Sequence, residues 1–242
     1  MTKVSCFILA LIPLVTNATT WGASEVEDPI QKGQMCSVYE PASYGGYIYS
    51  WPSKYDQVFW PLTEEYGIWF CEKSGFTALI GDFESLTADE AQQIKQFLAD
   101  NPPKDSSLQT KLFLLEKLYS MRQKDSAFAN RLLRILARWN QQLGNLAKAD
   151  EYRKVAFDSI KLRLADGLDG YQKLEYLYLA ANYSKQFGDN DSAEKYLGLL
   201  QQAIEQTVDE NVQGFAEYLS DLMQETKFIT QGGELDPVVP EA

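Results

Sequence analysis

From Ser107 almost to Phe228, apolar residues recur every three or four positions along the chain. This period is typical of α-helices, in which residues three and four apart lie on one face. Brief breaks interrupt the pattern, and connections this short make neighbouring helices antiparallel. We therefore expect stacked helical hairpins in this half of the chain. The expected helices cover residues 107–122, 126–143, 146–164, 170–187, 191–206 and 209–227.

Two of these hairpins share a pattern of large, small and glycine residues that resembles the tetratricopeptide repeat. Small residues let two helices approach closely, and a glycine lets the chain reverse direction. Gly144 and Gly188 lie further apart than the usual repeat period of about 34 residues, and Leu200 stands where a second alanine is expected. We interpret the region as tetratricopeptide-like, with a plain helical bundle as the alternative. The matching positions are Leu133, Leu136, Ala137, Gly144, Ala149 and Ala156, and then Leu177, Ala180, Ala181, Gly188 and Ala193.

The segment from Gln34 to Phe76 is rich in tyrosine and tryptophan, with six of the 14 tyrosines and three of the five tryptophans. Short aromatic and β-branched runs at 47–51, 57–60 and 68–72 are separated by turn residues, which predicts a small antiparallel sheet. Thr87 and Glu90 then have the spacing of a capping box at a helix start. The predicted fold class is α+β. The predicted divisions are a signal peptide at 1–23, a linker at 24–33, a β-rich ribbon-like module at 34–86, a helical tetratricopeptide-like region at 87–228 and a disordered tail at 229–242.

The first residues have the pattern of a secretory leader. Lys3 precedes an apolar run from Val4 to Val15, and small residues follow it, with cleavage expected after Ala18 or Ala23. An N-terminal membrane anchor or a buried helix is the alternative, but the run is shorter than the ~20 residues needed to span a bilayer. We expect a bacterial periplasmic or secreted protein without stable membrane insertion once the leader is removed.

The net charge of -12 and the absence of histidine restrict the function. Nucleic-acid affinity depends on clustered Lys and Arg, so no nucleic-acid partner is expected. Without histidine, the usual base of nucleophilic triads and the commonest catalytic zinc ligand are both missing.

The two cysteines after the leader each begin half of a zinc knuckle. Cys36-Ser-Val-Tyr39 and Cys71-Glu-Lys-Ser74 each lack the second cysteine of a Cys-x-x-Cys pair. Two thiolates with no histidine leave half of a tetrahedral zinc shell empty. We therefore predict no bound metal and no cofactor.

These half-knuckles, the run ending IWFCEKSGF, the following GDFESLTADEAQQI and the Leu-Gly-Asn and Phe-Gly-Asp turns resemble an uncharacterised bacterial family. That family has a zinc-ribbon-like module followed by tetratricopeptide-like helices, and the resemblance covers roughly Gln34 to Thr207. It implies no activity. It does imply a ribbon fold that holds Cys36 and Cys71 close together, so that a disulfide can form in an oxidising compartment. Two free buried thiols, or a metal or redox role, are the alternatives.

Two sets of residues are candidates for contact with a ligand. Aromatic rings at Tyr47, Tyr49, Trp51, Trp60 and Trp69 suggest a surface for a partner or a sugar, but a small sheet also needs large side chains for its core, which is the interpretation we favour. Carboxylates at Asp56, Glu64, Glu65, Asp82 and Glu84 include candidates for a glycosidase pair, although no spacing singles out two.

The expected function is therefore an exported, non-enzymatic scaffold. Stacked helical hairpins leave an extended concave surface that suits a protein or peptide partner. An acid/base glycan hydrolase or a carbohydrate-binding protein that uses the aromatic module is the alternative. A purely structural protein of an envelope assembly is a third.

Overall fold

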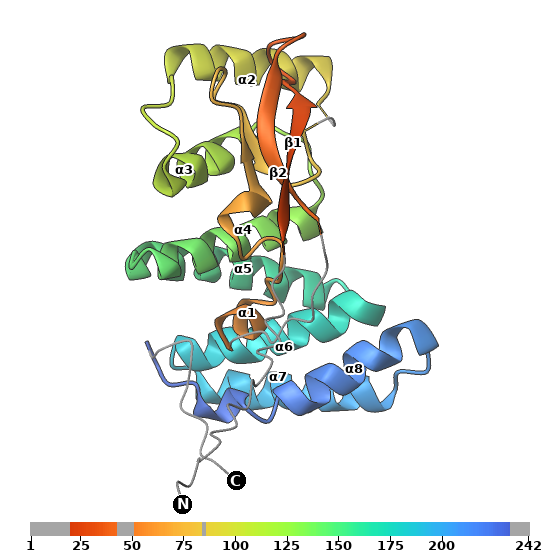
Figure 1. Ribbon diagram of the computed structural model, residues 1–242. Coiled ribbons are helices and arrows are strands. Elements are labelled where there is room, and N and C mark those ends of the chain that lie inside the picture. The colour runs from red at the N-terminus through yellow and green to blue at the C-terminus, as the bar shows by residue number, and fades with distance from the viewer. Residues whose placement is uncertain (1–19, 43–50, 84–85, 233–242) are drawn as a thin grey trace, which may run out of the picture.

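The computed structural model describes residues 20–42, 51–83 and 86–232, and confirms the α+β class (Figure 1). Strands and one short helix come first, and a stack of helices follows. The strands are β1 (Trp21–Glu27), β2 (Met35–Pro41), β3 (Ile68–Phe70) and β4 (Thr77–Leu79), with helix α1 (Trp51–Asp56) between β2 and β3. The later helices are α2 (Ala88–Asp100), α3 (Leu108–Tyr119), α4 (Ser126–Gln142), α5 (Leu146–Ala165), α6 (Gly170–Gln186), α7 (Asn190–Glu205) and α8 (Glu210–Leu222).

The predicted helices from residue 107 onward are confirmed, each with its ends within a few residues of the expected positions. The predicted capping box at the start of α2 is also present. The Thr87 hydroxyl accepts a hydrogen bond from the backbone N–H of Glu90 (3.3 Å), and the Glu90 carboxylate accepts one from the backbone N–H of Thr87 (2.8 Å). Both bonds satisfy donors that a helix start otherwise leaves free.

The tetratricopeptide-like pattern forms two packed hairpins, α4–α5 and α6–α7. Their small residues are fully buried at positions that include Ala137, Ala149 and Ala193. Each hairpin turns at a glycine in the left-handed backbone region, with φ of 77° at Gly144 and 83° at Gly188. An L side chain is strained in this region, which accounts for glycine at both turns.

The strands form two separate two-stranded antiparallel sheets. In the first, β1 pairs with β2 from Trp21↔Pro41 to Glu27↔Met35, and in the second, β3 pairs with β4. The predicted linker at 24–33 is therefore wrong in its first part, because Ser24 to Glu27 belong to β1. The exposed positions of this strand include Glu25 and Glu27, so its sequence has the polar, acidic character of a linker.

The leader prediction falls mostly outside the described residues. Cleavage after Ala23 would remove the first residues of β1, whereas cleavage after Ala18 would leave the strand whole. In the part of the chain that the structure describes, no helix combines the length and the apolar character needed to cross a bilayer.

The aromatic segment departs further from its prediction. Most of the expected strand at 47–51 lies outside the described residues, and the one expected at 57–60 is instead a turn. The residues before this turn form α1, which has Pro52 in its first turn, a position that proline favours. Only the expected strand at 68–72 is present, as β3 over Ile68–Phe70.

The buried apolar residues form two clusters whose division differs from the predicted boundary at residue 86. The first cluster joins β2, β3 and β4 to α2, α3 and α4, and the second joins α5 to α8. Tyr55 from α1 belongs to the second cluster. The predicted tail at 229–242 also begins too early, because Ile229 is buried and the Gly232 N–H donates to the carbonyl of Gln186 (2.9 Å). The rest of that tail lies outside the described residues.

Candidate functional site

A buried ion pair fixes α1 against the helical hairpins. Asp56 and Arg153 are both fully buried. Arg153 donates from Nε to Oδ1 (3.0 Å) and from Nη2 to Oδ2 (2.8 Å) of Asp56, and the Tyr183 hydroxyl donates to Oδ1 (2.8 Å). Burial by itself lowers the pKa of Arg153, and Asp56 together with the hydroxyl groups of Tyr55 and Tyr183 more than offsets this, so the pKa is raised. Asp56 thus has a structural role.

A second buried arginine binds the backbone that follows α1. Arg134 Nη1 donates to the carbonyls of Asp56 (2.8 Å) and Gln57 (3.1 Å) and to Glu175 Oε1 (3.1 Å). Further along the chain, the Trp139 indole N–H donates to the carbonyl of Leu62 (3.0 Å). Side chains of α4 therefore satisfy polar backbone groups along residues 56–62 that would otherwise be buried without partners.

The segment that these contacts hold lies against α4 and α6. Helix α1 contacts both helices, and Figure 1 shows it against α6. The end of the described chain also packs onto α6, where the Thr226 hydroxyl donates to the Asn182 side chain (2.8 Å). A segment from the N-terminal part of the chain and one from its end thus both pack onto α6.

A groove lies along the strands of the β module, and we call it the ribbon groove. Its volume is about 590 Å³, and it runs along β2 and β3. Its residues are Asp28, 35–39, Glu65, Tyr66, 68–73, Ser106 and Lys111. The predicted disulfide Cys36–Cys71 joins the two strands beside the groove, with Cα atoms 5.0 Å apart.

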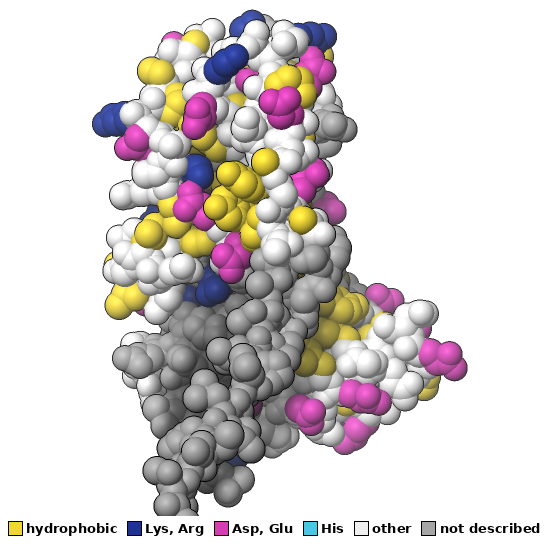
Figure 2. Space-filling model, viewed as in Figure 1, with side chains coloured by type: hydrophobic (Ala, Val, Ile, Leu, Met, Phe, Trp, Pro, Cys, Tyr) yellow, Lys and Arg dark blue, Asp and Glu magenta, His cyan; other side chains and the backbone are white. Residues whose placement is uncertain are grey.

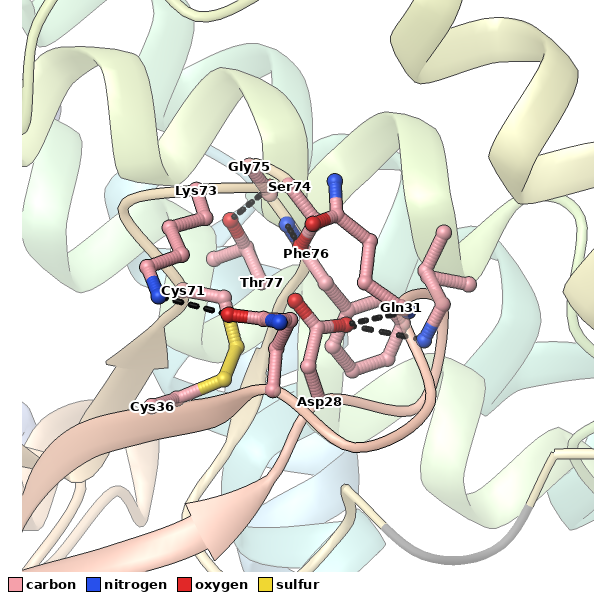
Figure 3. Close-up of a disulfide and its surroundings, with 11 residues drawn as sticks. Asp28, Gln31, Cys36, Cys71, Lys73, Ser74, Gly75, Phe76 and Thr77 are labelled. Atoms are coloured by element: carbon pink, nitrogen blue, oxygen red, sulfur yellow. Dashed lines mark hydrogen bonds between the residues drawn. A yellow bond between two sulfur atoms is a disulfide. The ribbon is translucent and has the colours of Figure 1, made fainter.

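Asp28 lies beside this disulfide and is only 1% exposed. Its Oδ1 accepts hydrogen bonds from the backbone N–H groups of Ile30 (2.8 Å) and Gln31 (3.1 Å), as is typical of an Asp that organises a turn. Its Oδ2 has no hydrogen-bond partner among the described residues. Figure 3 shows the disulfide next to this carboxylate, with the hydrogen-bonded oxygen directed towards the turn that contains Gln31.

Four aromatic side chains form a continuous series of ring contacts, and two of them, Tyr66 and Tyr39, line the ribbon groove. Ring centroids are 5.6 Å apart between Trp60 and Trp21, 5.3 Å between Trp21 and Tyr66, and 4.4 Å between Tyr66 and Tyr39. Tyr39, where a zinc knuckle would have a cysteine, packs against Tyr66 and is exposed, whereas Cys36 is buried. Neither Trp21 nor Tyr39 was among the residues predicted to contact a ligand.

Of the predicted aromatic contact residues, Trp60 and Trp69 have described side chains. Tyr47 and Tyr49 lie outside the described residues, and Trp51 is the first residue of α1. Trp60 is half-buried in the ring series. Trp69 is a core residue, only 6% exposed, with its indole N–H donating to the carbonyl of Tyr39 (2.9 Å). The core interpretation therefore holds for Trp69.

No protein-family model, curated protein or solved structure matches this chain. The family resemblance and the function therefore depend on the residues and their geometry alone.

Three of the candidate carboxylates, Asp56, Glu65 and Asp82, are engaged in ion pairs, and Glu64 is exposed. Asp56 binds Arg153, and Glu65 binds Lys111 (2.6 Å). Asp82 binds Arg122 (3.0 Å) and Lys124 (2.9 Å), and the Tyr119 hydroxyl also donates to it (2.7 Å). Burial, followed by this bond to Asp82, raises the pKa of Tyr119 far above its ordinary value. Glu84 lies outside the described residues. These contacts give Asp56 and Asp82 structural roles.

Proposed function

We propose that the protein is an exported, non-enzymatic scaffold that binds a protein or peptide partner through the ribbon groove. The observation that carries this proposal is the segment around α1, which lies against α4 and α6. The buried contacts of Asp56 with Arg153 and Tyr183 make that segment costly to displace. We therefore place the binding surface on the β module, where the ribbon groove lies.

The chemistry of the ribbon groove suits such a partner. Met35, Tyr39 and Tyr66 are 48%, 42% and 45% exposed. Methionine and tyrosine are enriched in protein interfaces, where they give large contact areas. Lys73 and Glu72 add charges of both signs beside these residues. Figure 2 shows the face of the module seen in Figure 1, with hydrophobic side chains gathered among acidic and basic ones.

The ring series supports a second candidate, a carbohydrate-binding protein. Sugars stack on exposed aromatic faces, and the series from Trp60 to Tyr39 is long enough to offer several rings in sequence. The rings are tilted, with 38° between the planes of Tyr39 and Tyr66. A flat sugar-binding platform would present coplanar rings, so the protein or peptide partner is the better supported proposal.

Photo-crosslinking in the native envelope tests the location of the binding surface. A photoreactive phenylalanine analogue at Tyr66 should crosslink to a partner, whereas the same analogue at Leu162 of α5, 69% exposed, should not. Crosslinks from Leu162 with none from Tyr66 would move the site to the helices. Retention on immobilised envelope glycans that Tyr66→Ala abolishes, without any protein crosslink, would favour the carbohydrate candidate.

Export through a leader is part of the same proposal. A mature N-terminus directly after Ala18 would leave β1 complete for pairing with β2. Mass spectrometry of the protein recovered from the envelope determines this terminus. Recovery of the uncleaved chain from the cytoplasm would contradict export.

A further inference from the structure

The carboxylate of Asp28 is buried with one oxygen lacking a partner among the described residues. Burying a charged oxygen without a donor is costly, so such a group usually has a proton, a water or a cation beside it. One carboxylate oxygen of Asp28 and the sulfur atoms of Cys36 and Cys71 all lie within 4.8 Å of one another. Three groups that can act as metal ligands thus meet at one buried point.

We propose that reduction of Cys36–Cys71 converts this cluster into a binding site for a thiophilic divalent cation of the zinc class. The sequence alone offers two thiolates, which leave half of a tetrahedral shell empty. Asp28, in the turn between β1 and β2, supplies a third ligand. Zinc accepts sulfur and carboxylate ligands together, and sites with three protein ligands retain a fourth position for water.

A dithiol can reduce the Cys36–Cys71 bond. The sulfur–sulfur bond breaks, each cysteine sulfur gains one electron and one proton, and the dithiol becomes a disulfide. The cation then replaces the two thiol protons, which pass to solvent. Two thiolates and one carboxylate carry three negative charges, of which the cation neutralises two.

The geometry requires only a local change. Zinc bonds of about 2.3 Å to sulfur and about 2.1 Å to oxygen separate tetrahedral ligands by slightly less than about 4 Å. After reduction the two sulfur atoms must move apart to this separation, whereas the carboxylate oxygen already lies within 4.8 Å of both. The nearby lysines are engaged elsewhere, Lys73 with the Gln34 side chain (2.6 Å) and Lys111 with Glu65 (2.6 Å). Neither forms a hydrogen bond with Asp28 that would occupy the cation position.

Cobalt(II) is a suitable probe because its visible spectrum reports tetrahedral sulfur coordination. The full chain, reduced with a phosphine under nitrogen, should bind one equivalent with an intense thiolate charge-transfer band. The oxidised chain should show no such band. Reduced protein that gives only the weak spectrum of hydrated cobalt would overturn the proposal.

Asp28→Asn tests the third ligand, with Glu72→Gln as the matched control. The amide retains an oxygen for the turn but is a poor metal ligand, so the affinity should fall by at least about tenfold, the loss typical of removing even an outer partner. Glu72 is an exposed carboxylate of the same groove next to Cys71. Its loss should leave the affinity unchanged. Equal affinities for the two variants would remove Asp28 from the site.

A measurement on the unaltered chain does not depend on the folding of a variant. A cation that binds only the dithiol form must shift the thiol–disulfide equilibrium towards that form. In a glutathione buffer, added Zn²⁺ should therefore raise the reduced fraction of Cys36 and Cys71. An unchanged fraction would contradict the proposal, whether or not a partner binds the ribbon groove.

Discussion

The β module and the helical hairpins are held together by different means. In the module, a covalent bond joins β2 to β3, which belong to two separate two-stranded sheets. In the hairpins, small residues pack helix against helix, and a fully buried ion pair from Arg153 to Asp56 fixes α1 onto them. The module has little regular structure, so a cross-link contributes much of its order. The backbone groups of a helix form hydrogen bonds within the helix, so the side chains of α4 and α5 remain available to bind the segment around α1.

This difference predicts that the ion pair matters more than the disulfide for the whole chain. Replacing Arg153 with Met leaves the Asp56 carboxylate buried without its partner. We expect a loss of about 3 to 5 kcal/mol in the free energy of unfolding, measured by urea titration followed by far-ultraviolet circular dichroism.

Lys148→Met is the matched control, because Lys148 pairs with Glu151 on the surface. Exposed pairs contribute at most about 1 kcal/mol, so this variant should differ little from the unaltered chain. If the two variants lost the same small amount of stability, the buried pair would not be what holds α1 in place.

Removal of the disulfide should affect the module first. The bond closes a loop over a sequence separation of 35 residues, and the chain-entropy relation gives about 3 to 4 kcal/mol for such a loop. Hydrogen exchange on the variant with Cys36→Ala and Cys71→Ala should show lost protection in β1 to β4.

The helices from α5 to α8 belong to the other apolar cluster, so their protection should persist in the same variant. Uniform loss of protection throughout the chain would show that the module and the hairpins unfold as one unit. The comparison between the two regions would then be wrong.

The same contrast explains what the sequence could predict. The helical period and the capping residues are local signals, and they located α2 to α8. Segment 51–62 depends instead on Arg134 and Arg153, which lie far along the chain. No local sequence pattern indicates such a contact, so the aromatic run at 57–60 was predicted to be a strand. The only local sign of α1 was Pro52 in its first turn.

The candidate site was predicted only in part, for a similar reason. The Cys36–Cys71 pair followed from the family resemblance. Asp28 lies in a stretch that the sequence presents as a polar linker, and it becomes a neighbour of the disulfide only because β1 pairs with β2. An Asp-Pro pair at Asp28-Pro29 indicates a turn, but a turn signal does not specify which buried group the Asp side chain will face.

The smallest expected effect concerns Glu90, which lies at the start of α2 and binds the chain that follows α3. Its carboxylate accepts hydrogen bonds from the backbone N–H groups of Thr87 (2.8 Å) and Gln123 (2.6 Å). These bonds lower the pKa of Glu90 below its ordinary value. The ionised group therefore stabilises the fold above the ordinary glutamate pKa of about 4.3, and the contribution is lost as the pH falls through the lowered value.

Glu90→Gln should cost about 1 kcal/mol at neutral pH, the usual size of a lost helix cap. It should also flatten the fall in stability on acidification, because the amide does not titrate. Urea titrations of both proteins from neutral to acidic pH measure the two effects. Glu194→Gln, at an exposed position of α7, is the control for a generic loss of negative charge, and the profile of Glu90→Gln should be flatter than that of this control. Parallel pH profiles for the unaltered chain and Glu90→Gln would mean that these hydrogen bonds do not couple α2 to the chain after α3.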